Sequence, residues 1–213
     1  MAGASGKPGR DCPRCPRLMA YRKHWRNKEP GWFNAPVPSF GPLDARLLIV
    51  GLAPGLQGAN RTGRPFTGDY AGVLLYETLL HYRFARGTYG AHPDDGLTLT
   101  DCRITNAVRC VPPENKPTPA EITTCRQFLS ATIAEMPKLT AILALGRIAH
   151  DSVLAALGEK KAAAPFKHGG KRKLDHVTLF ASYHCSRLNT NTGVLTPQMF
   201  RDVFKNLRGF LGP

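Results

Sequence analysis

The sequence has no long hydrophobic run. None of its apolar stretches approaches the roughly 18 residues that a membrane span needs, and the opening MAGASGKPGRDC lacks the apolar core of a signal peptide. These absences predict a cytoplasmic protein with no membrane partner. Because thiols stay reduced in that compartment, we do not expect the six cysteines to form a disulfide framework.

Acidic residues are also few. Only 15 Asp and Glu stand against 29 Lys and Arg, which gives a formal net charge of +14. An excess of this size attracts polyanions, and nucleic acid is the commonest partner that explains it. A basic surface that serves only solubility is the alternative that composition leaves open.

Two nucleotide-binding motifs are missing as well. The glycine-rich stretch GLAPGLQGANRTGRPFTGD, residues 51–69, contains neither G-x-G-x-x-G nor G-K-[ST]. The stretch instead combines free backbone N–H groups with the ring of Phe66 and the carboxylate of Asp69. That set suits a flat heterocycle better than a pyrophosphate. A long turn with Asp69 as the N-cap of the next helix is the structural alternative.

Alternating strand-like and helical segments predict an α/β fold. Apolar runs typical of strands lie at residues 46–51, 102–108, 140–146 and 176–183. Helical patterns lie at Leu18–Trp25, 71–83, 119–136, 147–157 and 197–210. Strands that are apolar almost throughout are typical of a parallel sheet covered on both faces. We predict a disordered segment at residues 1–11 and a single domain at 12–213.

The segments that follow the predicted strands form the candidate site, because ligands bind beyond the carboxyl ends of parallel strands. These segments are the loop at 51–69, Thr105-Asn106-Ala107, Gly146-Arg147 and Tyr183-His184-Cys185-Ser186. Near these strand ends there is no carboxylate cluster that could hold magnesium, which counts against a nucleotide hydrolase. We expect the four segments to converge.

Four of the six cysteines form two pairs. Cys12 and Cys15 make a C-x2-C motif, and Cys110 and Cys125 bound a proline-rich loop. Four thiolates from two such pairs complete either a structural zinc site or an iron–sulfur cluster, and the spacing does not decide between them. The other two cysteines are expected to be small apolar fillers: Cys102 and Cys185.

Taken together, the loop at 51–69, the strand end ITNAVRCVPP, the segment SYHCSRLNTNTGVLT and the paired cysteines resemble the family-five uracil-DNA glycosylases of bacteria and archaea. The resemblance runs from Cys12 to the last helix. It implies a monomeric three-layer α/β/α sandwich around a mainly four-stranded parallel sheet. It also implies a [4Fe–4S] cluster, rather than zinc, on Cys12, Cys15, Cys110 and Cys125. The chain departs from the family at Cys185, where proline is usual, and at Gly55, where alanine is expected.

The resemblance further implies a base-excision repair enzyme of the cytoplasm and nucleoid. Such an enzyme flips uracil out of double- or single-stranded DNA and hydrolyses its N-glycosidic bond, which leaves an abasic site. Hypoxanthine and xanthine are further expected substrates. The alternative is a non-catalytic iron–sulfur protein that binds nucleic acid or senses redox state. A mere binder does not need several polar side chains at one strand-end rim, which counts against that alternative.

The residues of the base pocket are implied by the same similarity. Phe66 would stack on the flipped base, while the Asn106 amide would accept a hydrogen bond from N3–H and donate one to O4. Cytosine presents the opposite pattern and would leave both amide groups unpaired. Other base contacts are expected from the start of the glycine-rich loop: Gly51, Leu52 and Ala53.

The catalytic residues implied are Asp69, Asn106 and His184. His184, as a neutral donor, would act with backbone N–H groups of the loop to stabilise the charge that gathers on O2 as the base leaves. Ala53 occupies a position where other uracil glycosylases have a polar or acidic residue, and Asp69 would place the water instead. The alternatives are a turn residue for Asn106 and a satisfied structural histidine for His184.

Basic side chains near the rim are expected to contact DNA phosphates: Arg61, Arg64, Arg147 and the run 167–173, which includes Lys171 and Arg172. That run is equally typical of a solvated hairpin. Three residues after His184 are also expected at the DNA: Ser186, Arg187 and Leu188. The last two are candidates for the wedge that fills the vacated stack, with an ordinary surface turn as the alternative.

Overall fold

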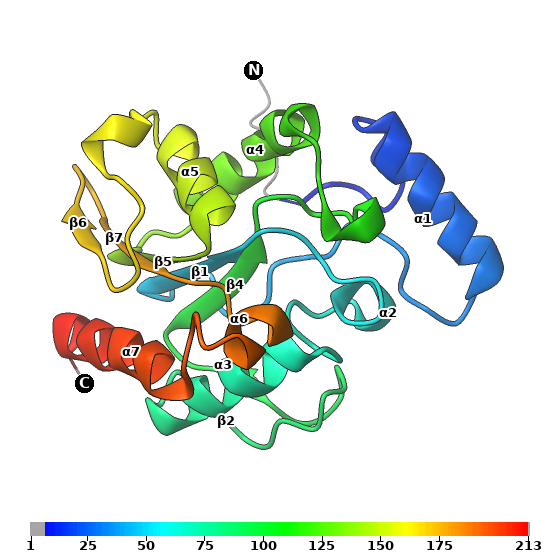
Figure 1. Cartoon of the computed structure of the whole chain (residues 1–213). Helices are drawn as coiled ribbons and strands as arrows, with labels where there is room; N and C mark the ends of the chain where they lie inside the picture. Colours follow the sequence, from blue (N-terminus) through cyan, green and yellow to red (C-terminus); the bar gives the residue numbers. More distant parts are fainter. Residues whose placement is uncertain (1–6, 213) are drawn as a thin grey trace.

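The chain is seen in a computed structural model that describes residues 7–212 (Figure 1). Residues 1–6 of the segment predicted to be disordered lie outside the described residues. Arg26 donates hydrogen bonds to the carbonyl of Arg10 and to the carboxylate of Asp11, which fixes residues 10 and 11 against helix α1 (Pro16–Lys28). None of the described helices is long and apolar enough to cross a membrane.

Five strands form the central sheet in the order β4-β1-β5-β7-β6. The parallel strands are β4 (Cys102–Asn106), β1 (Leu47–Gly51), β5 (Ala141–Leu145) and β7 (Thr178–Ser182). The edge strand β6 (Lys171–Lys173) pairs antiparallel with β7. Every residue of β1, β5 and β7 is buried, as in a sheet covered on both faces. The prediction of a mainly four-stranded parallel sheet is confirmed, and β6 extends it.

Helices cover both faces of the sheet and make it the middle of three layers (Figure 1). On one face lie α3 (Tyr70–His81) and α7 (Pro197–Leu211), and on the other α4 (Pro119–Ala134) and α5 (Arg147–Ala156). Successive residues of a strand point to opposite faces. Leu47 and Ile49 of β1 therefore join the core under α3 and α7, while Leu48 and Val50 join the core under α4 and α5.

The main helices begin near the predicted residues, where local sequence signals mark their starts. Thr118 and Glu121 form the capping box of α4, and Thr196 caps α7 by accepting from the N–H of Met199. Several short elements were not predicted: α2 (Ala59–Thr62), β2 (Ala85–Arg86), β3 (Thr98–Leu99), η1 (Pro113–Asn115), η2 (Lys161–Ala163) and α6 (Arg187–Asn191). Elements of two to five residues are too short to show a hydrophobic period.

Candidate active site

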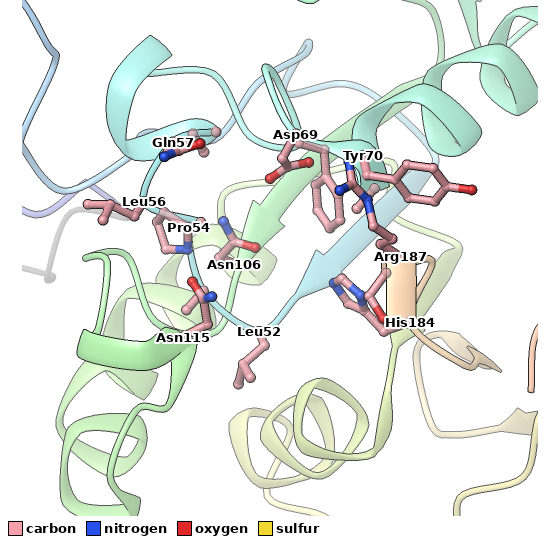
Figure 2. Close-up of a pocket in the computed structure, with 17 residues that line it drawn as sticks. Leu52, Pro54, Leu56, Gln57, Asp69, Tyr70, Asn106, Asn115, His184 and Arg187 are labelled. Atoms are coloured by element: carbon pink, nitrogen blue, oxygen red, sulfur yellow. The ribbon is translucent and has the colours of Figure 1, made fainter. Parts of the chain in front are cut away.

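A cavity of about 640 Å³ opens at the carboxyl ends of the parallel strands (Figure 2). It is lined by the glycine-rich loop, by Asn106 at the end of β4, and by His184, Ser186 and Arg187 after β7. Its size is that of a small-molecule site. Arg147, at the start of α5, lines an adjacent groove that shares His184 with the cavity. The predicted convergence of the strand-end segments is therefore confirmed.

Gly51 brings the Phe66 ring and the Asn106 amide together. Gly51 and Asn106 are register partners in β1 and β4. A Cβ at Gly51 would collide with Oδ1 of Asn106 and lie 2.7 Å from Cζ of Phe66, so only glycine allows both side chains this close to the strand end. Asn106 is 3% exposed, and no residue between 7 and 212 hydrogen-bonds its amide. Buried amides are normally paired, so this one is left available for a ligand.

His184 supplies a neutral donor to the same cavity. Its ring faces the cavity, with its centroid 5.9 Å from that of Phe66 (Figure 2). Burial lowers the pKa of His184 to about 4, so the imidazole is neutral at pH 7 and carries one N–H. Its backbone is fixed separately, because Asn189 Nδ2 donates to the His184 carbonyl at 2.8 Å.

Asp69 serves as a helix cap and also lines the cavity. Its Oδ1 accepts from the N–H of Gly72 at 3.2 Å, which makes it the N-cap of α3, as the structural alternative proposed. Its Oδ2 is turned toward Gly55 and Gly58, and a Cβ built at Gly55 would lie 3.1 Å from this oxygen. Burial raises the pKa of Asp69, against the opposing effect of the N–H groups of Gly72 and Ala71. The cap uses one carboxylate oxygen and leaves the other for chemistry.

The paired cysteines line a second, smaller cavity: Cys12, Cys15, Cys110 and Cys125. Burial raises the pKa of Cys15 to about 11 and that of Cys110 to about 12. The backbone N–H of Arg109 lies 3.3 Å from Sγ of Cys125 as a donor. Across residues 7–212, no group of three or more His, Cys, Asp or Glu side chains is arranged as a metal site.

The surroundings of these cysteines fit a negatively charged occupant. Arg22 is 2% exposed and lines the same cavity. Within residues 7–212, its guanidinium donates only to the carbonyls of Arg10 and Cys12, and its Nε has no hydrogen-bond partner there. A buried cation is costly without an anion beside it. Thiolates bound to a metal supply that anion, whereas neutral thiols do not.

The other two cysteines are core residues, as predicted. Cys102 and Cys185 are both 0% exposed and belong to the core under α3 and α7. Sγ of Cys185 lies 3.5 Å from the carbonyl of Ala71 as a donor. Burial raises the pKa of both thiols, which keeps them protonated and unreactive.

Two of the three residues predicted to contact DNA after β7 lie in the wall of the cavity. Ser186 and Arg187 line it, and the Arg187 guanidinium lies 5.2 Å from the ring centroid of Tyr70 (Figure 2). Leu188 is 72% exposed on α6. Leu188 directly follows Arg187 in the chain, and an apolar side chain this exposed has the character that a wedge requires.

Arg64 does not have the position predicted for a phosphate contact. It is 4% exposed, and its guanidinium forms a two-pronged ion pair with Asp95 at 2.8 and 2.6 Å. The prediction for Arg64 is wrong, because a buried and paired guanidinium cannot reach a phosphate at the surface.

The remaining basic candidates lie away from the cavity wall. Arg61 is exposed on α2. The ammonium of Lys171 lies 4.4 Å from the ring centroid of Phe210 in a separate groove, and Arg172 is exposed on β6. The segment 171–173 thus forms the exposed strand of a hairpin with β7, as the structural alternative proposed.

Three polar residues of the cavity wall were not predicted: Gln57, Tyr70 and Asn115. Asn115 belongs to η1, in the loop between Cys110 and Cys125, and has a left-handed backbone with φ 58°. That loop begins at Cys110, four residues after the end of β4. This short distance along the chain is the one sequence signal that places the loop at the carboxyl edge of the sheet.

Comparisons with known sequences all match the same protein family. A sequence model described as the uracil DNA glycosylase superfamily matches residues 38–208. A type-5 uracil-DNA glycosylase of Thermus thermophilus is 44% identical over 94% of this chain and 94% of the relative. A type-5 uracil-DNA glycosylase of Pyrobaculum aerophilum is 41% identical over 92% of this chain and 87% of the relative. A type-4 uracil-DNA glycosylase of Thermotoga maritima is 40% identical, over 51% of this chain and 49% of the relative.

Proposed function

The chain belongs to the uracil-DNA glycosylase superfamily and is a DNA-repair hydrolase that excises uracil, and we propose that the cavity at the carboxyl ends of the strands carries out this reaction. The observation that carries the proposal is the amide of the buried residue Asn106, which lies beside the Phe66 ring and makes no hydrogen bond to any of the described residues. The similarity to type-5 glycosylases over nearly the whole chain gives no support to a non-catalytic redox sensor.

Base recognition follows from the shape of the cavity and the amide at its end. A uracil inside the duplex cannot reach a buried side chain, so the nucleotide must be flipped out of the stack. Its ring then lies against Phe66, and the Asn106 amide accepts from N3–H and donates to O4. Thymine has the same polar edge, so its exclusion depends on the space around its methyl group. Cytosine leaves the amide unpaired, which is costly in a closed pocket.

Cleavage of the glycosidic bond places negative charge on the base and positive charge on the sugar. The neutral imidazole of His184 donates to O2, where the negative charge collects, as in an oxyanion hole. Among the described residues that line the cavity, Asp69 is the one carboxylate. It orients the water that attacks C1′ and stabilises the developing cation of the sugar. Ala53 also lines the cavity and has no polar group for that task.

The direct test is the release of uracil. The protein is incubated with an end-labelled duplex that contains one U·G pair and is then treated with alkali, which breaks the strand at an abasic site. We expect cleavage at the uracil, no cleavage in the matched duplex with a C·G pair, and cleavage of the same sequence as a single strand. Intact strands in all three reactions would refute the function.

We propose in addition that the cavity accepts a wider set of deaminated bases. Its volume of about 640 Å³ and the small side chain of Ala53 leave room for a bicyclic purine. Hypoxanthine and xanthine carry an N–H and a carbonyl on one edge, the groups that the Asn106 amide pairs with. Duplexes that contain each base in the same sequence context test this point. Excision restricted to uracil would show that the cavity selects against purines.

The cysteine cavity holds an iron–sulfur cluster in this proposal. Cys12, Cys15, Cys110 and Cys125 are its ligands, and the cluster joins the N-terminal segment to the loop after β4 and to α4. The buried charge of Arg22 and the N–H of Arg109 near Cys125 support the assignment. A brown protein with broad visible absorbance and four irons per chain is expected. A colourless protein with stoichiometric zinc would show that the four cysteines bind zinc and not an iron–sulfur cluster.

The rim supplies the wedge and part of the DNA contact. Leu188 enters the space that the flipped nucleotide leaves, and Arg187 contacts the neighbouring phosphate. Arg147 faces the adjacent groove and extends the same basic surface. The protein acts as a monomer in this proposal. Light scattering should give the mass of one chain for the free protein, and the mass of one chain plus one duplex for the DNA complex.

A further inference from the structure

The wall of the base cavity contains a backbone segment that side chains hold at three successive carbonyls. The Tyr76 hydroxyl donates to the carbonyl of Pro65 at 2.7 Å, and the Tyr89 hydroxyl donates to that of Phe66 at 3.2 Å. The Thr62 hydroxyl donates to the carbonyl of Thr67 at 3.1 Å. Segment 65–67 is therefore fixed from outside the cavity along its whole length.

This fixation matches an unusual backbone conformation. Phe66 has φ 52°, in the left-handed region that residues with a bulky side chain rarely adopt. Such a conformation persists only where the surroundings determine it. Gly72 contributes as well, because a Cβ there would collide with the Phe66 carbonyl and with the Tyr89 hydroxyl. The first turn of α3, Tyr89 and the carbonyl of Phe66 thus meet at one point.

A buried ion pair fixes the two tyrosines in turn. The Arg64 guanidinium lies 5.4 Å from the ring centroid of Tyr76 and 5.9 Å from that of Tyr89, and the two rings stack at 4.6 Å. Arg64 Nε also donates to Oγ1 of Thr67 at 2.7 Å. Asp95 completes the group, since its carboxylate pairs with Arg64 and accepts from the N–H of Gly90 and of Leu97.

We propose that Tyr89 and the Arg64–Asp95 pair are positioning residues that hold the Phe66 ring at the angle at which it stacks on the flipped base. None of the three lines the cavity among the described residues, so they act through Phe66 and not on the base itself. The inference rests on the proposed function, because it assigns a catalytic consequence to the position of that ring.

The Tyr89→Phe variant tests the proposal, because it keeps the stacked ring and removes only the hydroxyl. We expect its single-turnover rate of uracil excision to fall about 10-fold or more, since a misplacement near 1 Å can cost as much as 10²-fold. Affinity for a duplex with an abasic site should stay within twofold of wild type, because that duplex has no base to stack on Phe66. Inhibition by free uracil should weaken in parallel with the rate. Asp95→Asn should show the same pattern with a larger loss.

Tyr82→Phe is the matched control. Tyr82 stacks on Phe204 at 6.4 Å, away from the cavity, and its variant should match wild type in all three measurements. A Tyr89→Phe rate within twofold of wild type overturns the positioning role. So does an equal loss of rate and of abasic-site affinity, because that pattern marks general loosening of the fold. Failure of the proposed function is distinct, since the wild-type protein itself would then leave uracil in place.

Discussion

Asp69 caps a helix and is also proposed to act in catalysis, and a pair of substitutions separates these two roles. Its Oδ1 caps α3 through the N–H of Gly72, and its other oxygen is proposed to act on the water and the sugar. Asparagine is as good an N-cap as aspartate, so Asp69→Asn keeps the cap and removes the charge. Asp69→Ala removes both.

The expected sizes of the two effects follow from the roles of the two carboxylate oxygens. Loss of a positioned acid–base group costs about 10²-fold or more in rate, and we expect both variants to lose this much. Loss of the cap costs about 1 kcal/mol, which lowers Tm by about 2–4 °C in a domain of this size. Only Asp69→Ala should show that decrease. Burial raises the pKa of Asp69, so its charged form destabilises the fold at pH 7, and Asp69→Asn should melt no lower than wild type.

The assay is single-turnover excision on a U·G duplex with enzyme in excess, beside a thermal melt of each variant. The affinity of each variant for an abasic duplex is measured first in a separate titration. The enzyme concentration in the rate assay is then set high enough for all the substrate DNA to be bound. Excision of uracil by Asp69→Asn at the wild-type rate would show that the carboxylate is a cap and has no catalytic role. Equal melting of the Asn and Ala variants would refute the capping part alone.

Further expectations concern base reading, pH and salt. Asn106→Ala should lose uracil excision and keep its affinity for duplex DNA in a gel-shift titration; a loss of affinity would instead assign Asn106 to the fold. The pKa of His184 falls to about 4 from an ordinary 6.5, so its contribution to stability is complete above pH 6.5 and is lost as the pH falls toward 4. The unfolding free energy measured in urea should decrease by about 3 kcal/mol over that range, and His184→Asn should show a smaller decrease. DNA affinity should fall steeply with salt, and Arg187→Ala should reduce the slope of log K against log[salt] by about 1; an unchanged slope would remove Arg187 from the phosphate contacts.

The sheet and its covering helices could be predicted because their signals are local. The apolar runs of β1 and β5 are complete in five residues, and the Thr118 capping box marks the start of α4 within four. The strand β6 was not predicted as part of the sheet, because its three residues are Lys-Arg-Lys and all are exposed. An edge strand needs only one partner, so its sequence need not be apolar.

The site could be predicted where strand ends determine it. Asn106 is the last residue of β4, and His184 lies two residues after the end of β7. Parallel strands end at the same edge of the sheet, so both positions are expected there. Arg64 was wrongly assigned to DNA because its partner is Asp95, 31 residues further on, and no local pattern joins them. Asn115 was missed for a similar reason, since the path of the loop after β4 brings it back to the cavity.

The most direct measurement is a crystal structure of the Asp69→Asn variant bound to a duplex with one uracil. We expect a uracil turned out of the helix, with its ring against Phe66, its N3–H and O4 edge on the Asn106 amide and its O2 at the imidazole of His184. A uracil that is bound elsewhere, with the Asn106 amide facing away from it, would show that this cavity does not read the base.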